Sequence, residues 1–261
     1  MHTLHYFVHI PKTAGVTVRT WLRQVYARDE VIFVYDGTLA EAPDALSFSR
    51  PELLRRVAEL PASLRVLFGH YAFDTKSLLH DRCRALSIVR DPRARVLSWQ
   101  RYVQKNGRSL SDPMLARIAA SLDDGASLVD ACAREGGVAE IDNGIVRMFA
   151  NITGPAGAVD EASVELAKAR VEQFFDYVGH VDWFEHSMQR IADVLGRPYA
   201  FVPSKNESAG GRSEQLLAGG GARRADVGID EQWLAANTRH DEALVAWLRE
   251  RFPPPDGVDA G

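Results

Sequence analysis

The stretch LHYFVHIPKTAGVTVRTWLRQVY, residues 4–26, sets the architecture expected for the whole chain. Its first part, Leu4 to Ile10, is apolar enough for a buried strand, and apolar residues recur at helical spacing from Val18 to Val25. Only the short turn Pro11 to Gly15 separates the two. A strand that turns directly into a helix points backbone N–H groups and the positive end of the helix dipole at one place. The sequence therefore predicts an anion site at this turn.

Side chains of the turn add to this expectation. Lys12 supplies a mobile positive charge, and Thr13 and Thr17 supply hydroxyl donors, so phosphate or sulfate is the simplest ligand. The turn is not a Walker loop, because G-x-x-x-x-G-K-[ST] is absent and no strand ends in a convincing metal-binding acid. The alternative is an ordinary strand-to-helix turn with an exposed lysine.

Further short apolar runs, rich in β-branched and aromatic residues, alternate with helical segments. This pattern predicts an α/β fold, with a parallel sheet flanked by helices. Ligands of such folds bind beyond the carboxyl ends of the strands, so the residues directly after each strand are site candidates. The expected strands are 4–10, 31–35, 65–69, 85–90 and 176–181, and the expected helices are about 17–27, 51–60, 93–106, 113–121, 127–135, 142–150, 160–174, 184–195 and 231–251.

The length of 261 residues suits one α/β domain, which we expect to span residues 1–252. The mostly helical region of about 106–175 is expected to form a helical cap over the carboxyl edge of the sheet. Residues 203–230, rich in glycine, serine and charge, are expected to form a mobile loop, and the tail 253–261 to be disordered.

Composition restricts the partners and the compartment. A net charge of -4 argues against broad nucleic-acid binding. No apolar run approaches a membrane span, and no secretory signal precedes the first strand, so we expect a cytoplasmic protein without a membrane partner; an excised lumenal domain is the alternative. Cys83 and Cys132 are far apart, which favours free thiols, and no metal-ligand spacing is present. The oligomeric state cannot be derived from the sequence.

A second basic segment is IVRDPRARVLSWQRY, residues 88–102. Arg90 ends a strand, and Asp91 is placed to cap the following helix, with Pro92 in its first turn. Ser98 lies eight residues beyond Arg90, about two helical turns into the helix. Arg90, in bidentate fashion, and an inward-facing Ser98 are expected to reach one phosphate. The alternative, a solvated basic helix, applies above all to three further arginines, Arg93, Arg95 and Arg101.

The pair of motifs H-I-P-K-T-A-G (residues 9–15) and V-R-D-P-x-x-R-x-x-S-x-x-x-Y (residues 89–102) resembles the sulfotransferases that use 3′-phosphoadenosine 5′-phosphosulfate (PAPS). The likeness is greatest to the branch of heparan sulfate 2-O- and chondroitin sulfotransferases and their bacterial relatives. It implies their P-loop-like fold and spans about residues 4–208. Three further segments resemble segments of this family more weakly and occur in the same order along the chain: FGHYAF at 68–73, DNGIVRMFAN at 142–151, and VGHVDWFEHSMQRIADVLG at 178–196.

The resemblance implies nucleotide contacts. Arg90 and Ser98 would bind the 3′-phosphate, and Lys12 would stabilise the leaving group. In the family the position of Val16 is often small or hydroxylated, so only a backbone contact is expected there. Lys205 and Asn206, with Ser208, would touch the nucleotide from a late loop; a plain connection is the alternative. The residues implied to hold the 5′-phosphosulfate are Lys12, Thr13, Ala14, Gly15, Val16 and Thr17.

The resemblance also implies a reaction. His70, directly after a strand, would be the base for in-line, metal-independent transfer to a hydroxyl of a carbohydrate or other small acceptor, with adenosine 3′,5′-bisphosphate (PAP) as product. Asn143 and Arg147 would lie near the cleft, with Arg147 binding an anionic acceptor or bracing the nucleotide loop; a helix-surface pair is the alternative. His9 is expected to support the turn and His180 to be structural. The alternative functions are an ATP-dependent kinase and a non-catalytic nucleotide- or glycan-binding module.

Overall fold

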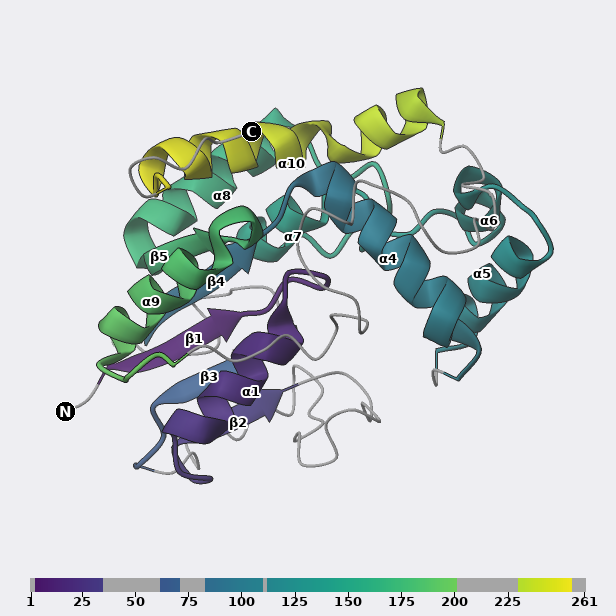
Figure 1. Cartoon of the computed structure of the whole chain (residues 1–261). Helices are drawn as coiled ribbons and strands as arrows, with labels where there is room; N and C mark the ends of the chain where they lie inside the picture. The colour runs from purple at the N-terminus through teal and green to yellow at the C-terminus, as the bar shows by residue number, and fades with distance from the viewer. Residues whose placement is uncertain (1–2, 35–61, 71–82, 110–111, 201–229, 255–261) are drawn as a thin grey trace.

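The computed structural model describes residues 3–34, 62–70, 83–109, 112–200 and 230–254 (Figure 1). Within them, five strands form an all-parallel sheet in the order β2-β3-β1-β4-β5, flanked by eight α-helices, which confirms the predicted α/β fold. The strands are β1 (Leu4–Val8), β2 (Val31–Val34), β3 (Val66–Gly69), β4 (Cys83–Val89) and β5 (Phe175–His180). The helices are α1 (Gly15–Val25), α4 (Pro92–Asn106), α5 (Pro113–Asp123), α6 (Leu128–Arg134), α7 (Gly144–Ala150), α8 (Glu161–Phe174), α9 (Phe184–Leu195) and α10 (Glu231–Arg251), with short 3-10 turns at Gly107–Ser109 and Val181–Trp183.

The sheet is buried on both faces, as the continuous apolar runs of its strands predict. Because side chains alternate along a strand, Tyr6 and Val8 of β1 pack with α7, α8 and α10, whereas Phe7 packs on the opposite face with α1 and α9. Figure 1 shows α8 and α10 on one side of the sheet and α1 and α9 across the other. Two apolar layers thus hold the sheet between helices.

A third apolar cluster lies apart from the sheet. Trp99 of α4, Ile118 of α5 and Cys132 of α6 pack together there, and Figure 1 shows these helices beyond the arrowheads of the strands. The region expected as a cap, 106–175, is therefore divided: α5 and α6 form this layer, but α7 and α8 cover a sheet face. The apolar residues of α8 that pack against the sheet are Val164, Ala167 and Val171.

The strands end in register at one edge. Val8 lies opposite Gly69 of β3 and Ser87 of β4, and Val89 lies opposite His180 of β5. The Ser87 hydroxyl donates to the Val8 carbonyl at 2.7 Å. The residues after β1, β3, β4 and β5 therefore share the carboxyl edge, as expected for a site. β1 ends two residues before its predicted end. The predicted helix 51–60, most of the loop 203–230 with Lys205, Asn206 and Ser208, and most of the tail lie outside the described residues.

A buried ion pair joins the layers. Arg95 of α4 and Asp241 of α10 are both fully buried, with Nη2 and Oδ2 3.5 Å apart. The Asp241 carboxylate also accepts the backbone N–H groups of Ile145 and Val146 at 3.1 and 2.8 Å, so it caps α7. Arg95 is therefore not part of a solvated basic helix, contrary to the alternative considered for the segment after β4.

Removing the Asp241 carboxylate should strongly destabilise the fold. Asp241→Ala leaves the buried Arg95 guanidinium without its counter-charge and the first turn of α7 without its cap. We expect a loss of about 3–5 kcal/mol in the free energy of unfolding, measured by denaturant titration. The exposed Asp193→Ala on α9 is the control and should stay within about 0.5 kcal/mol of the parent. A loss below about 1 kcal/mol for Asp241→Ala would contradict this role.

Candidate functional site

The turn between β1 and α1 is held in one shape by close packing. A Cβ atom added at Gly15 would lie 1.7 Å from Nε2 of His9, so only glycine fits there. Lys12 and Ala14 have left-handed backbone angles, with φ of 73° and 63°, a conformation that side chains disfavour unless their surroundings fix it. The buried hydroxyl of Thr13 donates to the Ile10 carbonyl at 2.8 Å. This hydroxyl thus braces the turn.

The start of α1 matches an anion-binding helix start elsewhere in the same chain. Residue Ala14 caps α1 in a left-handed conformation and makes no side-chain capping bond, and Asn143 begins α7 in the same way. At α7 the N–H groups of Ile145 and Val146 bind the Asp241 carboxylate. Unsatisfied N–H groups and the helix dipole favour a negative charge at such an end. The first turn of α1, which includes Val16 and Thr17, therefore offers an oxyanion a similar setting, in which the Thr17 N–H donates to the Ala14 carbonyl at 3.0 Å.

Lys12 joins the two basic segments of the sequence. Its Nζ lies 4.1 Å from the ring centroid of Tyr102 on α4. Tyr102 is the last residue of the second motif, and sequence reasoning assigned it no role. The contact brings the turn after β1 and the helix after β4 together at the carboxyl edge.

The predicted base lies beside the turn. The rings of His70 and His9 have centroids 4.5 Å apart, and His9 stacks on Phe68 at 4.9 Å. The expected support by His9 thus takes the form of a ring packed between Gly15, Phe68 and His70. Through this ring, the anion turn and His70 belong to one packed unit.

Both imidazoles are neutral at pH 7. Burial, followed by the charges of Arg19 and Lys12, lowers the pKa of His70 to about 4. Burial and then the neighbouring His70, Arg19 and Lys12 hold the pKa of His9 well below its usual range. Arg19, buried on α1, is a site residue that the sequence reasoning missed. Its position one turn after Gly15 was the available signal.

Arg90 follows β4, the strand that neighbours β1. Burial, and after it Arg101, lowers the pKa of the Arg90 guanidinium, while Asp182 and Asp91 act in the opposite direction. Arginine nevertheless remains charged at neutral pH. The Asp91 carboxylate accepts the N–H of Ala94 at 2.7 Å, which confirms the predicted cap of α4.

Ser98 is partly exposed on α4, two turns beyond the cap. In the described part of the chain, Ser98 and Arg90 make no hydrogen bond to each other. The three further arginines differ: Arg93 pairs with Glu231, Arg95 is buried, and Arg101 is exposed. Arg90 and Ser98 therefore remain the candidate phosphate ligands of this segment.

Asn143 and Arg147 are buried and bonded within the protein, so they are not the surface pair considered as an alternative. Asn143 Oδ1 accepts the N–H groups of His240 and Asp241 at 2.9 and 3.3 Å. Arg147 donates to the Asp142 carboxylate at 2.6 Å and also to the carbonyls of Asp142, Gly154 and Pro155. We assign both residues to the support of α7.

His180, the last residue of β5, has the structural role expected of it. Its ring is buried, stacks on Trp183 with centroids 4.6 Å apart, and lies 3.3 Å from a guanidinium nitrogen of Arg249. Burial, followed by the charge of Arg249, lowers the pKa of His180 to about 4. A third neutral imidazole thus lies at the carboxyl edge.

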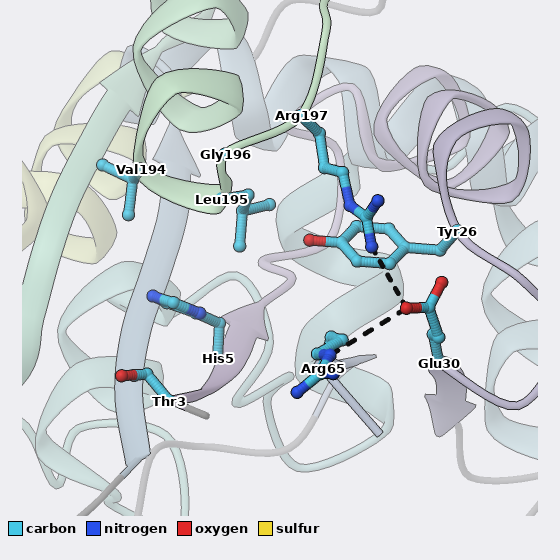
Figure 2. Close-up of a pocket in the computed structure, with 9 residues that line it drawn as sticks. All are labelled: Thr3, His5, Tyr26, Glu30, Arg65, Val194, Leu195, Gly196 and Arg197. Atoms are coloured by element: carbon cyan, nitrogen blue, oxygen red, sulfur yellow. Dashed lines mark hydrogen bonds and ion pairs between the residues drawn. The ribbon is translucent and has the colours of Figure 1, made fainter. Parts of the chain in front are cut away.

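A pocket of about 370 Å³ lies at the opposite, amino edge of the sheet. Figure 2 shows Glu30 between Arg65 and Arg197. Its Oε1 atom lies 3.9 Å from Nε of Arg65 and 3.1 Å from Nη2 of Arg197. The carboxyl ends of α1 and α9 adjoin it at Tyr26 and Leu195, and helix ends of that sign favour cations. The carboxylate and the helix ends balance the two arginines, so we assign this cluster to the packing of β2, β3 and α9.

The sequence matches no protein-family model, and no curated protein matches it. None of the helices in the described ranges is long and apolar enough to cross a membrane. Among the residues that the structure places, no group of three or more histidines, cysteines and acids could hold a metal ion.

His70 and His180 should make the fold sensitive to acid. Because the folded-state pKa of His70 and of His180 is about 4, below the unfolded value of 6.5, both favour the neutral form. The stability they contribute is present above pH 6.5 and is lost as the pH falls toward 4, by about 1.4 kcal/mol per unit of pKa shift. Burial raises the pKa of Asp241 to about 6, which acts in the opposite direction.

Variants separate these contributions. His70→Gln and His180→Gln should each reduce the loss of melting temperature between pH 7 and pH 4.5, measured by thermal unfolding. His186→Gln, on a partly exposed position of α9, is the control. Parallel curves for all four proteins would contradict the assigned pKa directions.

Proposed function

We propose that this protein is a PAPS-dependent sulfotransferase, which moves a sulfuryl group to a hydroxyl of a carbohydrate or other small acceptor. The observation that carries the proposal is the rigid β1–α1 turn with Lys12, at the same sheet edge as Arg90 and His70. The motif resemblance supports it, because the two segments that resemble this family are neighbours in the fold and meet at Lys12 and Tyr102.

The strand order supports a nucleotide site between β1 and β4. The chain leaves β1 toward β2 on one side of the sheet and leaves β4 toward β5 on the other. Adjacent strands whose connections diverge leave a crevice beyond their carboxyl ends, where ligands of parallel sheets bind. The turn after β1 and Arg90 after β4 border this crevice.

The residues of this edge fit the two anionic ends of the nucleotide. The first turn of α1, with Lys12, suits the 5′-phosphosulfate, because its N–H groups point to one place. Arg90 presents a planar fork for two oxygens of the 3′-phosphate, and Ser98 of α4 is proposed as a further donor. Recognition of the 3′-phosphate would distinguish this donor from ATP.

In the proposed reaction, an acceptor oxygen bonds to sulfur as the bond from sulfur to the 5′-phosphate oxygen breaks. Lys12 stabilises the charge that develops on the departing phosphate. His70, whose imidazole is neutral at pH 7, accepts the proton of the acceptor hydroxyl. The imidazole then releases this proton to solvent. The chain thus supplies positioning, electrostatic stabilisation and a base.

His70→Ala tests the base. Loss of the imidazole should reduce sulfuryl transfer by about 10²–10⁴-fold, measured with radiolabelled PAPS and a panel of carbohydrate acceptors. Binding of adenosine 3′,5′-bisphosphate should stay within a few-fold of the parent. His186→Ala serves as the matched control. Undiminished transfer by His70→Ala would remove this residue as the base, and magnesium-dependent ATP turnover without PAPS use would favour a kinase.

Arg90→Ala tests the 3′-phosphate subsite. The substitution should weaken the binding of adenosine 3′,5′-bisphosphate by about 10- to 100-fold, the loss expected for charge-assisted hydrogen bonds. The binding of adenosine 5′-monophosphate should stay nearly unchanged. Titration calorimetry with both nucleotides measures the difference. Arg101→Ala, at an exposed arginine of α4, controls for general charge. An equal loss for both nucleotides would refute the assignment of Arg90.

A further inference from the structure

The ring of Tyr102 and the ammonium group of Lys12 form a contact between segments 90 residues apart in the chain. Nζ of Lys12 lies 4.1 Å from the ring centroid. Tyr102 follows Ser98 by four residues on α4, so both lie on one face of the helix. We propose that Tyr102 is a positioning residue that holds the Lys12 ammonium at the first turn of α1 for the transfer step. The proposal rests on the proposed function.

A lysine that acts on a leaving group needs its ammonium group in a fixed position. A lysine side chain has four rotatable bonds, and fixing its end costs rotamer entropy. The backbone of Lys12, at a φ of 73°, fixes where the side chain starts but not where its end lies. An aromatic face attracts the ammonium by its quadrupole and adds no negative charge of its own. A ring therefore suits a lysine whose charge must act on a leaving group.

The ring of Tyr102 is itself firmly supported. It packs against the cluster that contains Trp99 and Val103 of α4 and Ile118 of α5. The layer of α4, α5 and α6 thus supports the Lys12 side chain at the carboxyl edge of the sheet. This gives a physical reason for the joint occurrence of the two sequence motifs.

The contact can be measured without any ligand. Lysines of the full-length protein are ¹³C-methylated reductively, and the Lys12 signal is assigned with Lys12→Arg. The ring current of Tyr102 should shift this signal upfield. Tyr102→Leu should abolish the shift, whereas Tyr102→Phe should keep it. An unshifted Lys12 signal in the parent would overturn the proposal, whatever the protein catalyses.

A double-mutant cycle tests the role in transfer. Tyr102→Leu should lower kcat for sulfuryl transfer by about 3- to 30-fold, the range of a partly desolvated cation–π contact, and Tyr102→Phe should restore it to within twofold. In the Lys12→Met background, Tyr102→Leu should cause no further loss, since it acts through Lys12. Lys105→Met, an exposed lysine of α4, is the control, and melting temperatures report any loss of folding.

The outcomes separate the two claims. Failure of the parent to bind adenosine 3′,5′-bisphosphate would refute the proposed function, and the role of Tyr102 in transfer would fall with it. Nucleotide binding by the parent combined with additive losses in the cycle, or with no rescue by Tyr102→Phe, would overturn the role of Tyr102 alone. Rescue by phenylalanine and a non-additive cycle would establish it.

Discussion

The close approach of the His9 imidazole to Gly15 is the constraint on which the candidate site depends. Because a Cβ atom would lie 1.7 Å from Nε2 of His9, the chain can pass from β1 into α1 only with glycine at this point. The same imidazole stacks on Phe68 and meets His70. One buried ring thus fixes the start of α1, the direction of its dipole and the position of the proposed base.

Two helices of the chain, α1 and α7, share the same backbone arrangement at their starts. Both α1 and α7 begin after a left-handed residue that makes no side-chain cap. At α7 the anion belongs to the protein itself: the Asp241 carboxylate binds the helix start, and Arg95 balances its charge in the core. At α1 the helix start lies at the carboxyl edge, with Lys12 in the preceding turn and the buried Arg19 one turn into the helix. This difference in surroundings separates a structural helix start from one suited to a ligand.

Much of the fold could be predicted because apolar runs and turn residues are local signals. The five strands, the cap of α4 by Asp91 and the shared carboxyl edge follow from such signals. Spacing alone does not tell which partner an amphipathic helix covers, so α8 was expected in the cap but packs on the sheet. Likewise, an i, i+4 pair does not reveal its depth, and Arg147 proved to be buried. Arg19 and Tyr102 were missed because their neighbours come from distant segments.

The central claim is that the turn after β1 and Arg90 after β4 together bind a 3′-phosphorylated adenosine nucleotide. The most direct measurement is titration calorimetry of the full chain with adenosine 3′,5′-bisphosphate in buffer containing a metal chelator. We expect saturable one-to-one binding that is at least tenfold tighter than binding of adenosine 5′-monophosphate, because a charge-assisted subsite is added. Absence of saturable binding, or equal affinity for the two nucleotides, would contradict it.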